Sequence, residues 1–117
     1  MDNNKLIAKF MGFKSITNAT IRTTKEYDYR IITNYEISLF QTSWDWLMPV
    51  VEKIESLEGG KLFSVFIVGN GCDIAISTKY RPNGEDWDAP SFRVDDNTKL
   101  DATYNSVTSF INWHQNQ

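Results

Sequence analysis

Residues 43–57, SWDWLMPVVEKIESL, decide the fold, because they predict an amphipathic helix on which a core can form. Apolar residues recur there at three- and four-residue spacing and therefore share one stripe of a helix. Short polar side chains before the first turn can accept hydrogen bonds from free N–H groups, and Gly59-Gly60 supplies a stop. The stripe consists of Leu47, Val50, Val51, Ile54 and Leu57. We therefore expect a central helix at about residues 44–58.

A β-hairpin is predicted at about residues 61–77. Two apolar runs flank Gly69-Asn70-Gly71, and Asn-Gly is the preferred pair for a type I′ turn. Phe63, Val65 and Ile67 share one face of the first strand. Its other face, with Leu62, Phe66 and Val68, is also mostly apolar. Since a strand that is apolar on both faces is usually covered on both, this pattern predicts a sheet between two layers of helices.

The rest of the chain shows weaker patterns of helices and strands. Residues 3–11 predict a short helix, and residues 99–114 predict a longer C-terminal helix that begins after the caps at residues 96–98. Residues 13–42 predict two or three strands, because alternating apolar positions such as Tyr35, Ile37 and Leu39 suit an extended chain. Residues 1–117 are therefore expected to form a single α+β domain, with an antiparallel sheet layered between helices in an ABA-type sandwich.

Composition narrows the class of protein. Hydrophobic residues make up 41% of the 117 residues, which is enough apolar surface for an ordered core. The net charge is −3 and the basic residues are scattered, so binding of nucleic acid through its phosphates is disfavoured. The one cysteine, Cys72, excludes an intrachain disulfide framework and suits a reducing compartment.

Neither a secretion signal nor a membrane span is expected from the sequence. The first residues, MDNNKLIAKFMGFK, lack the basic start and continuous apolar run of a signal peptide. No apolar run approaches the roughly 20 residues that a spanning helix needs. We therefore expect a cytoplasmic protein that does not enter a membrane.

The residue types that carry chemistry do not form a recognisable set. Cys72 follows a tight turn and His114 is the one histidine, but Asp73 beside the thiol would oppose an activated Cys–His pair. The acidic runs at residues 85–88 and 95–96 lack the alternating ligands and glycine of a calcium loop. We therefore expect no catalytic residues, no cofactor and no metal, and hence not an enzyme.

An aromatic and acidic loop at residues 78–98 is the candidate interaction surface. Trp, Tyr and Arg are enriched at protein interfaces, and this loop carries all three. Alternatively, Trp87 plugs a local core beneath a long loop. The residues assigned to the surface are Tyr80, Arg81, Asp86, Trp87 and Asp88.

Four segments together resemble a family. They are the end of the first helix at Lys9-Phe10-Met11-Gly12, the Trp44-Asp45-Trp46 entry into Val50-Val51-Glu52-Lys53-Ile54, the Phe63-Ser64-Val65 strand, and the helix from Ala102. In this order they are similar to small phage and prophage proteins with an ABA sandwich domain. The resemblance implies a cytoplasmic protein of a bacterial host or its phage, without an assigned activity, and it carries over no functional residues.

Two functions from different classes follow as hypotheses. The first is a phage or prophage accessory protein that acts through protein–protein contacts, with self-association as one form of contact. The second is a module that binds a small ligand, such as a nucleotide in a counter-defence role, through Tyr80, Arg81 and Trp87.

Overall fold

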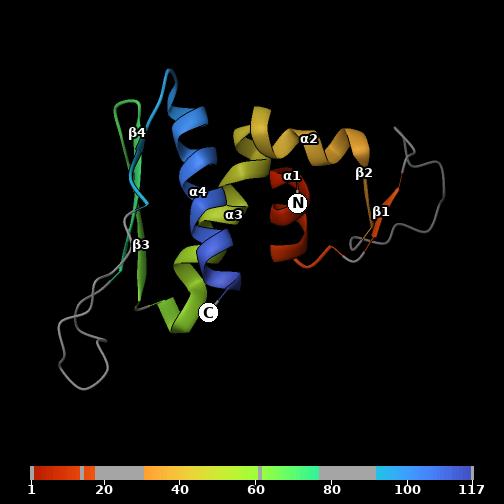
Figure 1. The fold of residues 1–117 in the computed structure, drawn as a ribbon, viewed down its shortest axis with the longest axis horizontal. Helices are drawn as coiled ribbons and strands as arrows, with labels where there is room; N and C mark the ends of the chain where they lie inside the picture. The colour runs from red at the N-terminus through yellow and green to blue at the C-terminus, as the bar shows by residue number, and fades with distance from the viewer. Residues whose placement is uncertain (1, 14, 18–30, 61, 77–91, 117) are drawn as a thin grey trace.

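The computed structural model describes residues 2–13, 15–17, 31–60, 62–76 and 92–116. These residues form an α+β fold in which a three-stranded antiparallel sheet packs against helices, as the sequence predicts (Figure 1). A separate pair of short parallel strands lies at the far end of the molecule from this sheet. The elements in chain order are α1 (Asn3–Phe10), β1 (Ser15–Thr17), β2 (Ile31–Thr33), α2 (Asn34–Thr42), α3 (Trp44–Ser56), the 3-10 turn η1 (Leu57–Gly60), β3 (Phe63–Val68), β4 (Gly71–Ile76), β5 (Val94–Asp95) and α4 (Lys99–Gln115).

α3 confirms the helix predicted from residues 43–57, and four of the five stripe residues are buried as expected: Leu47, Val50, Val51 and Ile54. The fifth, Leu57, is half-buried and belongs to η1, because α3 ends at Ser56. The helix begins at Trp44, so Pro49 lies in its second turn. The chain leaves the helix through left-handed backbone at Glu58, where φ is +52°, and at Gly59, where φ is +72°. This abrupt exit reverses the chain into β3.

The C-terminal helix α4 is the centre of the fold, rather than α3. It contacts all three strands of the sheet on one side and α1, α2 and α3 on the other. Because neighbours surround it, its small polar residues Thr103, Ser106 and Thr108 are buried together with its apolar residues. The predicted span of residues 99–114 matches the helix to within one residue.

The prediction of a strand around Tyr35, Ile37 and Leu39 is wrong, because these residues belong to α2. Thr33 starts this helix with a capping box: its Oγ1 accepts from Glu36 N at 3.0 Å, and Glu36 Oε1 accepts from Thr33 N at 3.1 Å. Two first-turn donors are thereby satisfied, and this local chemistry outweighs the alternating apolar pattern. Of the described residues between 13 and 42, six form strands, in β1 and β2.

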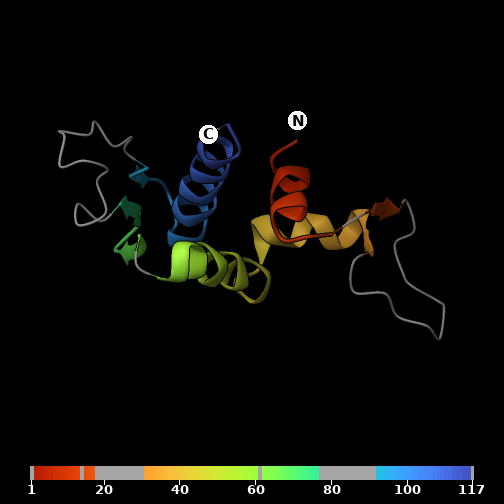
Figure 2. The same ribbon diagram turned by 90° about the horizontal axis from the view of Figure 1, so that it is seen from below.

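The helices cover one face of the β3–β4–β5 sheet, where two covered faces are predicted. Figure 2 shows α3 and α4 on the same side of the strands, with α1 and α2 beyond them. Among the described residues no helix lies over the opposite face, which we call the outer face. The described part of the chain therefore does not form the predicted helix–sheet–helix sandwich.

Candidate functional site

The outer face of the sheet carries exposed apolar side chains. The strand register places Phe66 opposite Asp73, and Val68 opposite Gly71, on this face. Phe66 is 55% exposed and Val68 is 71% exposed. Apart from these two, the only large hydrophobic residue that is exposed in the described part of the chain is Tyr35, on α2. The outer side of β3 is therefore an unusual concentration of exposed apolar surface.

The inner face of the same strand is packed into the core. Phe63 is 4% exposed, and its ring meets that of Phe110 edge-on with centroids 4.8 Å apart. On β4, Ile74 and Cys72 are each 1% exposed. The contrast between the two faces follows from the pleat, since successive side chains point to opposite sides of a sheet.

Charged groups border the exposed apolar residues on the outer face. Asp95 pairs with Gly71 in the register, and Arg93 Nη2 lies 3.1 Å from its carboxylate oxygen. A Cβ at Gly71 would lie 2.5 Å from Asp95 Oδ1, so glycine leaves room for this ion pair to cross the strand. The outer face is therefore apolar along β3 and polar toward β5.

In the part of the chain that the structure describes, β3 is also an edge strand, since the sheet order there is β3-β4-β5. A two-residue turn joins it to β4, and the pair that flanks such a turn, Val68 and Gly71, exchanges both backbone hydrogen bonds. Hydrogen-bonded and non-hydrogen-bonded pairs then alternate along the hairpin. It follows that the N–H and C=O groups of Phe63, Val65 and Ile67 point away from β4, toward the free edge.

The turn differs from the predicted one. Its central residues are Gly69 and Asn70, whereas Gly71 begins β4. Gly69 has φ of +59° and Asn70 does not have positive φ, which suits a type II′ turn with glycine first rather than a type I′ turn. Asp96 N donates to Asn70 O at 3.0 Å, and Asn70 Nδ2 donates to Asn97 O at 3.3 Å, so the turn is tied to the start of α4.

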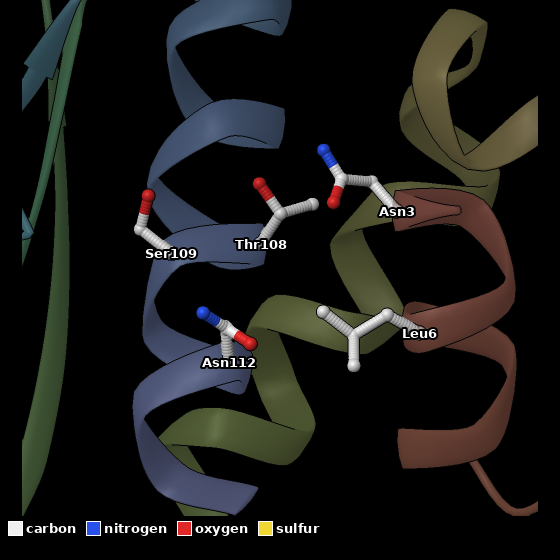
Figure 3. Close-up of a pocket in the computed structure, with 5 residues that line it drawn as sticks. All are labelled: Asn3, Leu6, Thr108, Ser109 and Asn112. Carbon is white, nitrogen blue, oxygen red and sulfur yellow. The ribbon is translucent and has the colours of Figure 1, made fainter. Parts of the chain in front are cut away.

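A second feature is a polar cavity of about 330 Å³ between α1 and α4. Figure 3 shows Asn3 and Leu6 of α1 facing α4 across this cavity. Thr108 is 6% exposed, and its Oγ1 donates to Asn105 O at 3.0 Å. Amide and hydroxyl groups predominate in the lining, so the cavity suits hydrogen bonding to a small neutral molecule. The lining residues are Asn3, Leu6, Thr108, Ser109 and Asn112.

Beside this cavity, Tyr104 ties α4 to the start of α1. Its phenol oxygen donates to Asn4 Oδ1 at 2.8 Å. Burial raises the pKa of Tyr104 to about 12, and the nearby Asp2 carboxylate acts in the same direction. The hydroxyl is therefore protonated and acts as a neutral hydrogen-bond donor at physiological pH.

Cys72 and His114 do not form a pair. The Cys72 thiol hydrogen-bonds Ser106 and Thr103, and burial raises its pKa even though these bonds act in the opposite direction. His114 lies eight residues beyond Ser106 on α4, roughly 12 Å along the helix axis. Its ring stacks on Phe110 with centroids 5.6 Å apart. Both side chains therefore have packing roles in the described structure.

The predicted interaction surface lies outside the described residues. Its members, Tyr80, Arg81, Asp86, Trp87 and Asp88, all fall within residues 77–91. The described ranges contain no group of three metal-ligating side chains that could hold an ion. They also contain no helix that is long and apolar enough to cross a membrane.

Sequence reasoning missed Phe66 and Val68 because it assumed that both faces of the hairpin are covered. A signal was nevertheless present on the partner strand. Cys72, Ile74 and Ile76 alternate with Asp73 and Ala75, as in a strand with one buried and one solvated face. The two-residue turn then places Asp73 on the same face as Phe66.

Comparisons with known proteins identify no similar protein. No family model, no curated protein and no solved structure matches the chain.

Proposed function

We propose that this chain is a non-enzymatic module that acts through protein–protein contacts, and that the outer face and free edge of β3 form its binding surface. The observation that carries the proposal is the exposure of Phe66 and Val68 on an edge strand. The resemblance to phage accessory proteins and the cytoplasmic location remain predictions, and the proposal does not depend on them.

Burial of Phe66 and Val68 by a partner would be favourable. Removing apolar surface from water contributes about 25 cal/mol per Å², and phenylalanine is among the largest apolar side chains. Neither residue contributes its side chain to the packed core. An apolar centre bordered by Asp73, Arg93 and Asp95 also matches the common arrangement of an interface, with an apolar core and a polar rim.

The free edge adds directional hydrogen bonding. Edge strands in natural proteins are usually protected from pairing by charged residues, prolines or bulges. β3, with the sequence FSVFIV, contains no charged residue and no proline, and its six register pairs with β4 run without a bulge. An extended segment of a partner can therefore add to the sheet as a further strand.

The proposal is tested by affinity capture from a lysate with two matched variants. Phe66→Lys places a charge at the centre of the proposed surface, whereas Tyr35→Lys alters the equally exposed Tyr35 on α2. We expect the wild type and Tyr35→Lys to retain the same proteins, including further copies of the chain, and Phe66→Lys to lose them. Equal retention by all three, or retention of nothing by a strictly monomeric wild type, would contradict the proposal.

A second candidate function is binding of a small polar molecule, and the cavity between α1 and α4 favours it. Its volume falls at the lower end of ordinary ligand sites, which span about 300–1,000 Å³. A thermal-shift screen with nucleosides, sugars and amides tests this function. A stabilising compound should lose its effect in Thr108→Val, which keeps the side-chain shape and removes the hydroxyl. No shift with any compound would remove this candidate.

A further inference from the structure

We infer that the partner of β3 is a second copy of this chain, and that the two β3 strands pair antiparallel about a two-fold axis into one continuous six-stranded sheet. This inference rests on the proposed function and names the partner of the same surface. It follows from the direction of the edge groups, from the side chains that self-pairing brings together, and from the placement of charge.

The backbone of β3 is its own complement. The N–H and C=O groups of Val65 and Ile67 point to the free edge, as derived above from the register with β4. In an antiparallel pair, two residues that face each other exchange both hydrogen bonds. Placing Val65 opposite the partner's Ile67 satisfies the edge groups of both residues, and the two-fold axis repeats the pair.

This register brings Phe66 against its own copy. Phe66 then faces the partner's Phe66 at the axis, in a non-hydrogen-bonded pair, where side chains approach most closely. On the inner face, the half-buried Val65 and Ile67 meet the same two residues of the partner, which extends the core across the axis. Ser64 faces the partner's Val68. Apolar side chains therefore meet on both faces of the joined sheet.

Charge does not oppose the pairing. β3 itself is uncharged. The closest charge to Phe66 in the register is Asp73, one strand away. In the joined sheet the two Asp73 carboxylates are separated by three strand spacings, about 14 Å. That distance exceeds the Debye length of about 8 Å at physiological ionic strength, so their repulsion is largely screened.

The expected dimer is weak. Six residues of edge strand with two exposed apolar side chains correspond to an interface at the small end of the range, below about 1,200 Å². We expect a dissociation constant of roughly 10–100 μM. Sedimentation velocity of the full chain should show a reversible monomer–dimer equilibrium. Concentrations from about 5 to about 500 μM bracket the expected dissociation constant.

Amide hydrogen exchange identifies the surface. The amides of Ser64, Phe66 and Val68 bond to β4 and should be protected at every concentration. The amides of Val65 and Ile67 should exchange rapidly in dilute protein and become protected as the dimer forms. A dimer in which Val65 and Ile67 continue to exchange freely would overturn the inference, because another surface would then hold the copies together. A protein that stays monomeric at the highest concentration would overturn it as well.

Phe66→Lys places two like charges at the axis and should weaken dimerisation by about tenfold or more. Tyr35→Lys should leave the equilibrium unchanged. Val68→Lys serves as a second variant if Phe66→Lys does not fold, which circular dichroism would show. A dimer of unchanged strength in a folded Phe66→Lys or Val68→Lys variant counts against self-pairing.

Failure of self-pairing and failure of the proposed function have different signatures. A monomeric wild type that retains a different protein, and loses it in Phe66→Lys, contradicts self-pairing and leaves the proposed function standing. A monomeric wild type that retains no protein contradicts both. Capture of a different protein by a chain that also dimerises through Val65 and Ile67 supports both.

Discussion

The two faces of β3 have similar composition and opposite surroundings. Phe63 on the inner face is 4% exposed and meets Phe110, whereas Phe66 on the outer face is 55% exposed. Both residues belong to one six-residue strand and both are phenylalanine. The difference teaches that an apolar pattern indicates which faces of a strand could be buried. The neighbouring elements then decide which of these faces is actually covered.

The comparison also separates folding from binding. Inner-face residues stabilise the monomer because helices already cover them. Outer-face residues gain little from folding, and in the proposed function their apolar character serves contact with another chain. Two of the four measurements below test this division, and the other two test contacts within the helical part of the fold.

The largest expected effect comes from the same substitution on each face. Phe63→Ala removes a buried ring and leaves a cavity beside Phe110, so we expect unfolding to become easier by about 3–5 kcal/mol. Phe66→Ala should cost below about 1 kcal/mol in dilute, monomeric protein, because most of the ring is already in water. Urea unfolding of both variants measures the difference. Equal costs would show that the outer face is packed and would remove the contrast.

The sequence was sufficient to predict an element where a single pattern of residues dominates that segment. The stripe of residues 43–57, the hairpin and the helix at residues 99–114 are all predicted and confirmed. The sequence was insufficient to predict features that depend on how the elements pack against one another. The central position of α4, and the open outer face, depend on how helices are distributed between the two sides of the sheet, which no local pattern specifies.

The second error was the strand predicted in place of α2, and its cause is local hydrogen bonding at the start of that helix. Tyr35, Ile37 and Leu39 alternate as in a strand, yet they follow Thr33 and Glu36, which together form a capping box. The box is visible in the sequence as Thr-x-x-Glu and is a recognised helix start. The candidate interaction surface lies outside the described residues and stays a prediction for its five members, Tyr80, Arg81, Asp86, Trp87 and Asp88.

Thr33→Ala tests whether the cap keeps α2 helical against its alternating pattern. The substitution removes the Oγ1 that accepts from Glu36 N, and we expect a cost of about 1–2 kcal/mol. Glu36→Gln is the matched control, since glutamine retains an oxygen that can accept from Thr33 N. This substitution should lower the free energy of unfolding by a few tenths of a kcal/mol, about the value of a weak contact between helix side chains. Helix content by circular dichroism and urea midpoints check both. An unchanged Thr33→Ala would mean that packing alone holds α2.

Tyr104→Phe tests the hydrogen bond between α4 and α1 and its dependence on pH. The pKa of Tyr104 is raised to about 12 in the folded chain, from the ordinary tyrosine value of 10.0. Between these values the unfolded chain releases the proton and the folded chain keeps it, so this contribution to stability is complete below pH 10 and is lost as the pH rises toward 12. At pH 8 the variant should cost roughly 1 kcal/mol through loss of the bond to Asn4.

The deficit of Tyr104→Phe relative to the wild type should therefore shrink as the pH rises from 8 to 11. Other groups that titrate in this range, such as the Cys72 thiol, are present in both proteins and largely cancel. Urea midpoints at three pH values measure the trend. Parallel curves would show that the phenol is as accessible to solvent in the folded chain as in the unfolded one.

Gly71→Ala gives the smallest expected effect and tests the outer face directly. The new Cβ would lie 2.5 Å from Asp95 Oδ1 and 3.2 Å from Arg93 Nη2, so the ion pair must move. Both atoms end flexible side chains that are more than half exposed, and exposed ion pairs contribute about 0–1 kcal/mol. We therefore expect a cost below about 1 kcal/mol, and Gly71→Ala combined with Asp95→Ala should recover most of it. A cost of about 3 kcal/mol, within the range of buried-core substitutions, would mean that the ion pair is held rigidly over the strand. The outer face would then be a packed surface rather than one left open to a partner.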